Sequence, residues 1–169
     1  MEIQQMCQHP TNEEEDWECR KQKIKLRRNV IPEIYVDLFC LLVNVYRQCK
    51  EIQQNPPQNG SYPTHTPQEF REYIQQLYYF LLQLYDHLHD VQTSSDKLPT
   101  HLLQTGQDLH LFQVHPNRQQ IVISSIPPPP HPIVTIYYDE EQNLTANVRF
   151  LRPPPPGNYV FLLLVVLLL

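Results

Sequence analysis

Apolar residues recur through residues 66–91 in a pattern that predicts one long amphipathic helix. The apolar positions follow one another at steps of 4, 3, 4, 3, 4 and 3 residues: Phe70, Ile74, Leu77, Leu81, Leu84, Leu88 and Val91. This spacing places them on one helical face. Thr66 with Glu69 has the form of a capping box, and Pro67 suits the first turn. A helix with so long an apolar face needs a partner that buries it.

A second amphipathic helix is predicted at residues 32–54, opened by Pro32. Its seam positions are Ile34, Leu38, Leu41, Val45 and Ile52. A linker rich in Pro, Asn and Gly follows, so we expect the two helices to pack as an antiparallel hairpin. The second helix has a wide apolar stripe and should be covered on more than one side. The longer helix carries further apolar side chains that would contact the first helix or a second copy, which would make the protein a homodimer: Tyr78, Tyr79, Phe80 and Leu82.

A third helix is predicted before these two, capped by Thr11 with Glu14. Acidic residues come first and basic residues last, an order that complements the helix dipole. The ordinary interpretation is therefore a solvated surface helix. The alternative is that its basic residues form a nuclear-localisation or phosphate-contacting patch: Arg20, Lys21, Lys23, Lys25, Arg27 and Arg28.

From residue 108 the apolar period changes to two, which predicts strands. Residues 109–114 and 120–126 form one expected hairpin, with its turn at Pro116 and Asn117. Residues 133–138 and 144–151 form a second. In the last strand apolar and polar residues alternate, which is typical of a half-buried antiparallel sheet.

The fold class predicted is therefore α+β, an antiparallel helical hairpin of two to three helices followed by a small antiparallel β-sheet of two hairpins. We expect a disordered lead at residues 1–11 and the helical domain at 12–91. A linker at 92–107, with a short helix at 98–104, would precede the β region at 108–151. A proline-rich spacer at 152–158 and an apolar tail at 159–169 end the sequence.

Composition narrows the function classes. The formal net charge of −5 and the pI near 5.9 argue against a general polyanion binder, so nucleic acid is not an expected partner. The 3 glycines are scattered, which excludes phosphate-cradling loops of the P-loop or Rossmann type. The 4 cysteines contain no C-x-x-C pair. We therefore expect reduced thiols rather than a disulfide framework or a zinc site.

The motifs of catalysis are missing from the sequence. His87 and His89 are two apart, so on a helix they diverge and cannot share a metal ion. No nucleophile and base stand at a meaningful spacing. We predict no enzyme, no cofactor and no metal site; the minor alternative is an active site assembled from dispersed histidines.

Two short segments are candidate interaction motifs. Tyr137 and Tyr138 precede three acidic residues, which suits phosphotyrosine readers, although plain strand residues would give the same pattern. The four consecutive prolines could dock on an aromatic groove or act as a spacer: Pro127, Pro128, Pro129 and Pro130.

Residues 159–169 carry no charge and would reach only ~16 Å as a helix, against the ~30 Å of a bilayer core. They could insert partway or associate, begin a membrane helix that continues further, or form a buried strand. We favour membrane contact, which would place the protein at the cytoplasmic face of a membrane. The alternative location is nuclear.

One resemblance bears on the alternative. The run Gly106–Leu111, a hairpin ending at Ile123–Pro127 and a later polyproline tract resemble the N-terminal dimerisation domain of the lymphocryptovirus nuclear antigen that coactivates transcription. The resemblance implies a dimerising β region, and it carries over no functional residue. The function we predict is a non-enzymatic interaction, adaptor or regulatory protein, of the layout common among viral accessory proteins, tethered to a membrane by its C-terminus. The alternative is a nuclear transcription-regulatory protein that dimerises through its β region.

Overall fold

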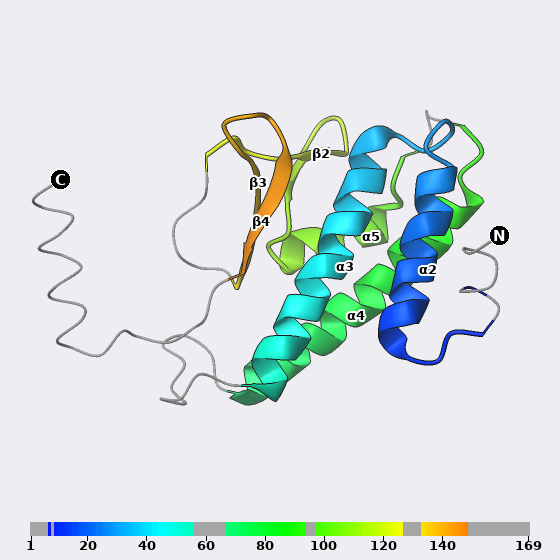
Figure 1. Ribbon diagram of the computed structural model, residues 1–169. Coiled ribbons are helices and arrows are strands. Elements are labelled where there is room, and N and C mark those ends of the chain that lie inside the picture. The colour runs from blue at the N-terminus through cyan, green and yellow to red at the C-terminus, as the bar shows by residue number, and fades with distance from the viewer. Residues whose placement is uncertain (1–6, 8, 56–66, 94–96, 127–132, 149–169) are drawn as a thin grey trace, which may run out of the picture.

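The computed structural model describes residues 7, 9–55, 67–93, 97–126 and 133–148. In this part of the chain helices come first and strands follow, which confirms the α+β class. The elements are α2 (Glu13–Leu26), α3 (Glu33–Gln54), α4 (Pro67–Asp90), α5 (Thr100–Asp108), β1 (Gln113–His115), β2 (Gln120–Val122), β3 (Val134–Tyr138) and β4 (Leu144–Val148). Figure 1 shows α3 between α2 on one side and the β3–β4 hairpin on the other.

The helices α3 and α4 pack against each other and run in opposite directions, as predicted (Figure 1). All seven predicted seam positions, from Phe70 on α4 to Val91 just after it, are buried. On α3 the prediction is correct for Leu38, Val45 and Ile52, but Ile34 and Leu41 are only half-buried. The buried face of α3 is wider than one heptad seam, because α2, α4 and β4 all cover it. The capping box predicted at Thr66 lies outside the described residues.

The helix α2 begins one residue later than the capping prediction. Asn12, not Thr11, is the N-cap: its Oδ1 accepts a 2.8 Å hydrogen bond from Glu15 N. Thr11 instead donates its backbone N–H and its hydroxyl to the Glu15 carboxylate. Asn and Thr are both good caps, so their order in the sequence did not decide between them.

The interpretation of α2 as a solvated surface helix is wrong. Trp17 is only 1% exposed, and its ring lies 6.4 Å from that of Phe39, 5.9 Å from Tyr46 and 6.0 Å from Tyr78, measured between centroids. Ile24 is also buried, one heptad further along. Large aromatic side chains dominate the energetics of a core, so Trp17 anchors α2 onto α3 and α4. Tyr78 was one of the apolar residues expected to contact the first helix or a second copy. It contacts Trp17 of α2 in the same chain.

The cysteine prediction also needs correction. Cys7 and Cys19 form a disulfide across a sequence separation of 12 residues, while Cys40 and Cys49 are free. The missing C-x-x-C pair does not bear on cysteines that are further apart in the sequence. Cys7 lies before α2, so helical spacing does not restrict its approach to Cys19.

The segment after α4 differs from the prediction in where helix ends and strand begins. The helix α5 reaches residue 108, and residues 109–112 are not a strand. His110 has a φ of 61°, and Leu111 N donates a 2.9 Å hydrogen bond to Gly106 O. A left-handed residue after a helix is usually Gly or Asn. Since His110 takes that place here, the sequence carries no clear stop signal.

Both predicted hairpins are present. The strands of the first hairpin are shorter than expected, and residues 149–151 of the last predicted strand lie outside the described residues. Val114 faces Ile121 across β1–β2, and Ile136 faces Ala146 across β3–β4. Within the described residues the hairpins form two separate two-stranded sheets, linked by a 3.0 Å hydrogen bond from Tyr138 N to Ser124 O. A two-stranded sheet is weak alone, and β4 packs against α3. No helix in the described ranges has the length and apolar character to cross a bilayer, and residues 159–169 lie outside them.

Candidate functional site

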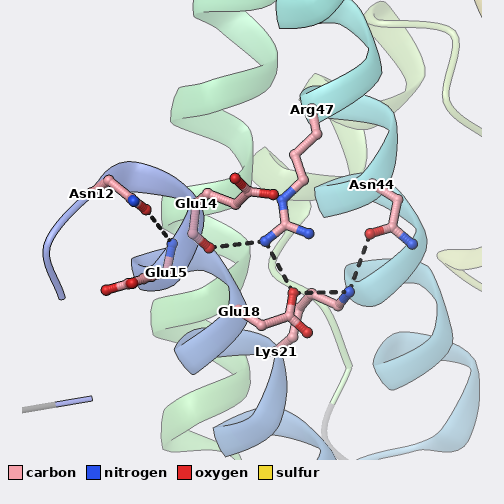
Figure 2. Close-up of polar contacts among 7 residues, drawn as sticks. All are labelled: Asn12, Glu14, Glu15, Glu18, Lys21, Asn44 and Arg47. Carbon is pink, nitrogen blue, oxygen red and sulfur yellow. Dashed lines mark hydrogen bonds and ion pairs between the residues drawn. The ribbon is translucent and has the colours of Figure 1, made fainter. Parts of the chain in front are cut away.

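The interface between α2 and α3 contains a chain of charged hydrogen bonds, shown in Figure 2, which we call the polar seam. Arg47 of α3 donates to Glu14 O at 2.9 Å and to Glu18 Oε2 at 3.0 Å. Lys21 lies 3.6 Å from the same carboxylate oxygen and donates a 3.1 Å hydrogen bond to Asn44 Oδ1. Lys21 is only 7% exposed, and buried charges of this kind require such partners.

Electrostatics favour the charged form of Glu18. Partial burial acts to raise the pKa of its carboxyl, but the Arg47 hydrogen bond and the charges of Lys21 and Arg47 outweigh burial, so that the pKa is lowered. An ionised Glu18 therefore holds both cations in place. The seam fixes the position of α2 on α3.

The Glu13 carboxylate makes a second connection between these helices. Its Oε1 accepts a 2.6 Å hydrogen bond from the Tyr46 hydroxyl and a 3.4 Å one from Trp17 Nε1. Burial and the neighbouring carboxylate raise the pKa of Tyr46. Both aromatic side chains are therefore held in one orientation by their polar ends.

Beside Trp17 and Tyr46 lies a hollow of about 490 Å³, which we call the aromatic groove. Its lining comes from the first turns of α2 and the second half of α3: Asn12, Glu13, Glu14, Trp17, Tyr46, Arg47, Lys50, Glu51 and Gln54. The groove combines two aromatic rings with charged side chains of both signs. This is the chemistry of a protein or peptide contact.

A second hollow, of about 340 Å³, lies near the end of α2, and we call it the basic groove. Three distant segments line it: Lys25 and Arg28, then Asp37, Cys40, Leu41 and Asn44 of α3, and Asn143 and Leu144 of the second hairpin. Burial raises the pKa of the Cys40 thiol despite the opposing charges of Lys25 and Lys21.

The six predicted patch residues do not form one free face. Only Lys23 and Arg28 are exposed, whereas Lys21 is buried in the polar seam. The Arg20 guanidinium lies 4.9 Å from the centroid of the Trp17 ring. Lys25 is half-buried and lines the basic groove.

Arg27 has a structural partner. Its guanidinium donates to the carbonyl oxygens at the end of α4, to Leu88 O at 2.6 Å and also to His89 O and Val91 O. The last carbonyl oxygens of a helix have few N–H donors within the helix, and a cation complements the negative end of the dipole. Arg27 therefore joins the end of α2 to the end of α4.

The tyrosine candidates lie in β3, where Tyr137 and Tyr138 are half-buried. In the following turn, Asp139 accepts hydrogen bonds from Glu141 N and Asn143 N, so this acid shapes the turn. Residues 127–130, the four prolines, lie outside the described part of the chain, as does the tail at residues 159–169.

The structure brings no metal ligands together among the residues it describes. His87 is half-buried, and its Nε2 finds no hydrogen-bond partner there. His89 instead stacks on Tyr85 and lies 3.7 Å from Asp90 Oδ1.

Sequence reasoning missed most of the residues that build the two grooves and the polar seam, and it named Lys21, Lys25 and Arg28 only as members of a basic patch. Trp17, Lys21 and Ile24 lie at steps of 4 and 3, a helical seam interrupted by one lysine. The two apolar members, one heptad apart, were the available signal for a packed face. No signal pointed to Tyr46, Arg47 or Asn44, because their partners are more than 20 residues away.

Comparisons with known proteins add no relative. The chain matches no family model, no curated protein and no solved structure. The fold and the candidate site are accordingly argued from this chain alone.

Proposed function

We propose that this chain is a non-enzymatic interaction protein, an adaptor or regulator, that binds a partner peptide in the aromatic groove. The observation that carries the proposal is a hollow with a charged rim beside the rings of Trp17 and Tyr46. The two rings are only 1% and 5% exposed, so the side chains of the rim, Arg47 among them, make most of the contact with a partner. Arg is among the residues that most often dominate binding energy at protein interfaces. A volume of about 490 Å³ accommodates a few side chains.

Preorganisation supports this proposal. The two rings lie 5.9 Å apart and share Glu13 as a hydrogen-bond acceptor. The polar seam holds the helices on either side of the groove. A partner would therefore spend little free energy on ordering the site.

The state of the buried thiols and phenols also supports a non-enzymatic role. Burial raises the pKa of Cys40, and it raises the pKa of Cys49 to about 12. The pKa of Tyr46 is raised as well. Protonated thiols and phenols are poor nucleophiles and poor bases near neutral pH.

The test is a peptide selection with matched variants. Random peptides displayed on phage are selected on the immobilised protein, and the enriched peptides are then measured by fluorescence anisotropy. We expect Lys50→Glu and Glu51→Lys, both on the groove rim, to change affinity at least about tenfold, since they reverse charges at the site. Gln76→Lys, exposed on α4, is the control and should leave affinity unchanged. Peptides that bind all variants equally would refute the aromatic groove as the site.

We propose a location at the cytoplasmic face of a membrane, through residues 159–169. A fluorescent fusion with and without these residues tests it. If the full chain is diffuse or nuclear and the truncation changes nothing, the tether is refuted.

The alternative, a regulator that dimerises through its β region, has one observation in its favour. Val122, at the end of β2, is 44% exposed, and Ile126, four residues further along, is 73% exposed. A second copy could cover them. Sedimentation analysis of the wild type beside the double variant Val122→Asp, Ile126→Asp separates the alternatives: only a dimer through this hairpin would dissociate in the variant.

A further inference from the structure

The basic groove is separate from the aromatic groove and carries a different chemistry. We propose that it binds an acidic segment of a partner protein. Lys25 and Arg28 hold the carboxylates of that segment, while Leu41 and Leu144 contact an aliphatic side chain beside them. This inference stands apart from the function proposed for the aromatic groove, which has no residue in common with it.

The first argument is the convergence of three segments on one hollow. The end of α2, the first half of α3 and the turn into β4 all line it. Figure 1 shows α3 in the middle, with α2 and the β3–β4 hairpin on its two sides. The site therefore exists only in the folded chain.

The second argument is unbalanced charge. Lys25 and Arg28 line the hollow and, within the described residues, neither forms an ion pair with a carboxylate. Among the described residues of the lining, Asp37 is the one acid. The charges of Lys25 and Arg28 act on the Cys40 thiol, and that of Asp37 acts on it in the opposite sense. Two cationic side chains that line one hollow beside a single acidic side chain favour an anionic ligand.

The third argument concerns the nearby acidic turn, which could have neutralised these cations. Its Asp139 carboxylate instead accepts two backbone hydrogen bonds, from Glu141 N at 3.0 Å and Asn143 N at 2.8 Å. Glu141 Oε2 accepts from Asn143 Nδ2 at 3.4 Å. Asp139 and Glu141 keep their negative charges, but their contacts lie within the turn, and neither they nor the exposed Glu140 forms an ion pair with Lys25 or Arg28 among the described residues.

A fourth argument is the orientation of Asn44. Its Oδ1 accepts from Lys21, so its amide nitrogen points away from that cation, as Figure 2 shows. Asn44 therefore adds a neutral donor to the two charged ones. The half-buried side chains Leu41 and Leu144 supply apolar surface in the same hollow, which selects a peptide segment over a free anion.

Cys40 makes the proposal directly testable because it lines the groove. Cys49 is buried, and Cys7 and Cys19 form a disulfide. Cys40 is therefore the thiol that an alkylating reagent reaches in the folded protein. The experiment measures the rate of Cys40 alkylation by iodoacetamide at mildly alkaline pH, followed by mass spectrometry of the full chain.

The probe is a blocked peptide with two glutamates on each side of a leucine. Near ten times its dissociation constant, mass action predicts Cys40 alkylation slowed by about tenfold. The same peptide with glutamines should give no protection. Raising NaCl from about 50 mM to about 500 mM should weaken the protection, because salt screens the charges. Protection by the glutamine peptide, or none by the glutamate peptide, overturns the proposal.

Two further arms identify the site and the source of the anion. The double variant Lys25→Gln, Arg28→Gln should lose the protection, while Lys23→Gln, exposed on α2 outside the groove, should keep it. Circular dichroism checks that both variants fold. If they do not fold, the comparison of the glutamate and glutamine peptides on the wild-type protein decides whether the groove binds an acidic segment. Inorganic phosphate that protects Cys40 as well as the glutamate peptide does would show a general anion site and refute a peptide partner. If the experiment on one groove refutes its proposal, the proposal for the other groove is unaffected.

Discussion

The Tyr46 hydroxyl and the Glu13 carboxylate form a 2.6 Å hydrogen bond that joins α3 to α2 across 33 residues of sequence. Glu13 stands in the first turn of α2, where a negative charge complements the helix dipole. The same carboxylate also accepts from Trp17. One acid thus completes the N-terminus of a helix, orients two aromatic rings and forms one wall of the aromatic groove.

The first prediction concerns this bond. Tyr46→Phe keeps the ring and removes the hydroxyl, so we expect the free energy of unfolding to fall by about 1.5–3 kcal/mol, the contribution of a hydrogen bond to a charged group. Urea denaturation followed by circular dichroism measures it. Tyr79→Phe is the control, because Tyr79 is 51% exposed. Equal effects of the two substitutions would show that the Tyr46–Glu13 bond contributes nothing.

The second prediction concerns alkaline pH. Burial raises the pKa of Tyr35, Tyr46 and Tyr73 above the ordinary value near 10. Between the unfolded and folded pKa values the folded chain binds more protons, so stability is complete below about pH 10 and falls as pH rises above it. In a titration followed by phenolate absorbance, these tyrosines should ionise together with unfolding in one steep transition. Ionisation of all 10 tyrosines near pH 10 with the circular dichroism unchanged would contradict the prediction.

The third prediction concerns the helical hairpin. Leu81 is fully buried on the seam of α4, and Leu81→Ala should lower the free energy of unfolding by about 2–5 kcal/mol through lost contacts and a cavity. Leu26→Ala is the control, because Leu26 is 69% exposed and should change stability by less than about 0.5 kcal/mol. Thermal and urea unfolding measure both. Similar stabilities would mean that the seam does not form the core.

The residues predicted well are those whose partners follow from periodicity. The apolar pattern of α4 repeats over seven positions, so any other rotation of the helix would expose its whole apolar face to water. The burial of Leu77, Leu84 and Leu88 therefore follows from the sequence. The second hairpin was predicted equally well from the sequence. Its alternating residues flank a turn of acidic and amide residues.

The residues predicted badly are those whose roles depend on distant contacts. Lys21 looked like one member of a basic run, yet its ammonium group lies beside Glu18 and Asn44. Arg27 looked similar and bonds to carbonyls more than 60 residues away. A sequence pattern reports spacing along one element. It cannot report which charge of a run the fold will bury.

The fourth prediction concerns the disulfide. The Cys7–Cys19 bond closes a loop before and within α2, and a loop of this length stabilises a fold by about 2–4 kcal/mol. A dithiol reductant, or Cys7→Ser, should lower the unfolding temperature. Cys40→Ser is the control, because Cys40 is a free thiol. Non-reducing peptide mapping that found Cys7 and Cys19 unlinked would contradict this.

The fifth prediction concerns Gly106, where α5 meets the ring of Phe112. A Cβ at this position would overlap atoms of that ring, which is itself buried and packs on Phe80. Gly106→Ala must therefore displace the ring, and we expect a loss of about 1–3 kcal/mol from overpacking. The control is His101→Ala, at an exposed position of the same helix. In a double-mutant cycle with Phe112→Leu, the alanine should cost less than in the wild type, because the smaller side chain leaves room for the methyl group. Additive effects in that cycle would show that Gly106 is not constrained by this contact.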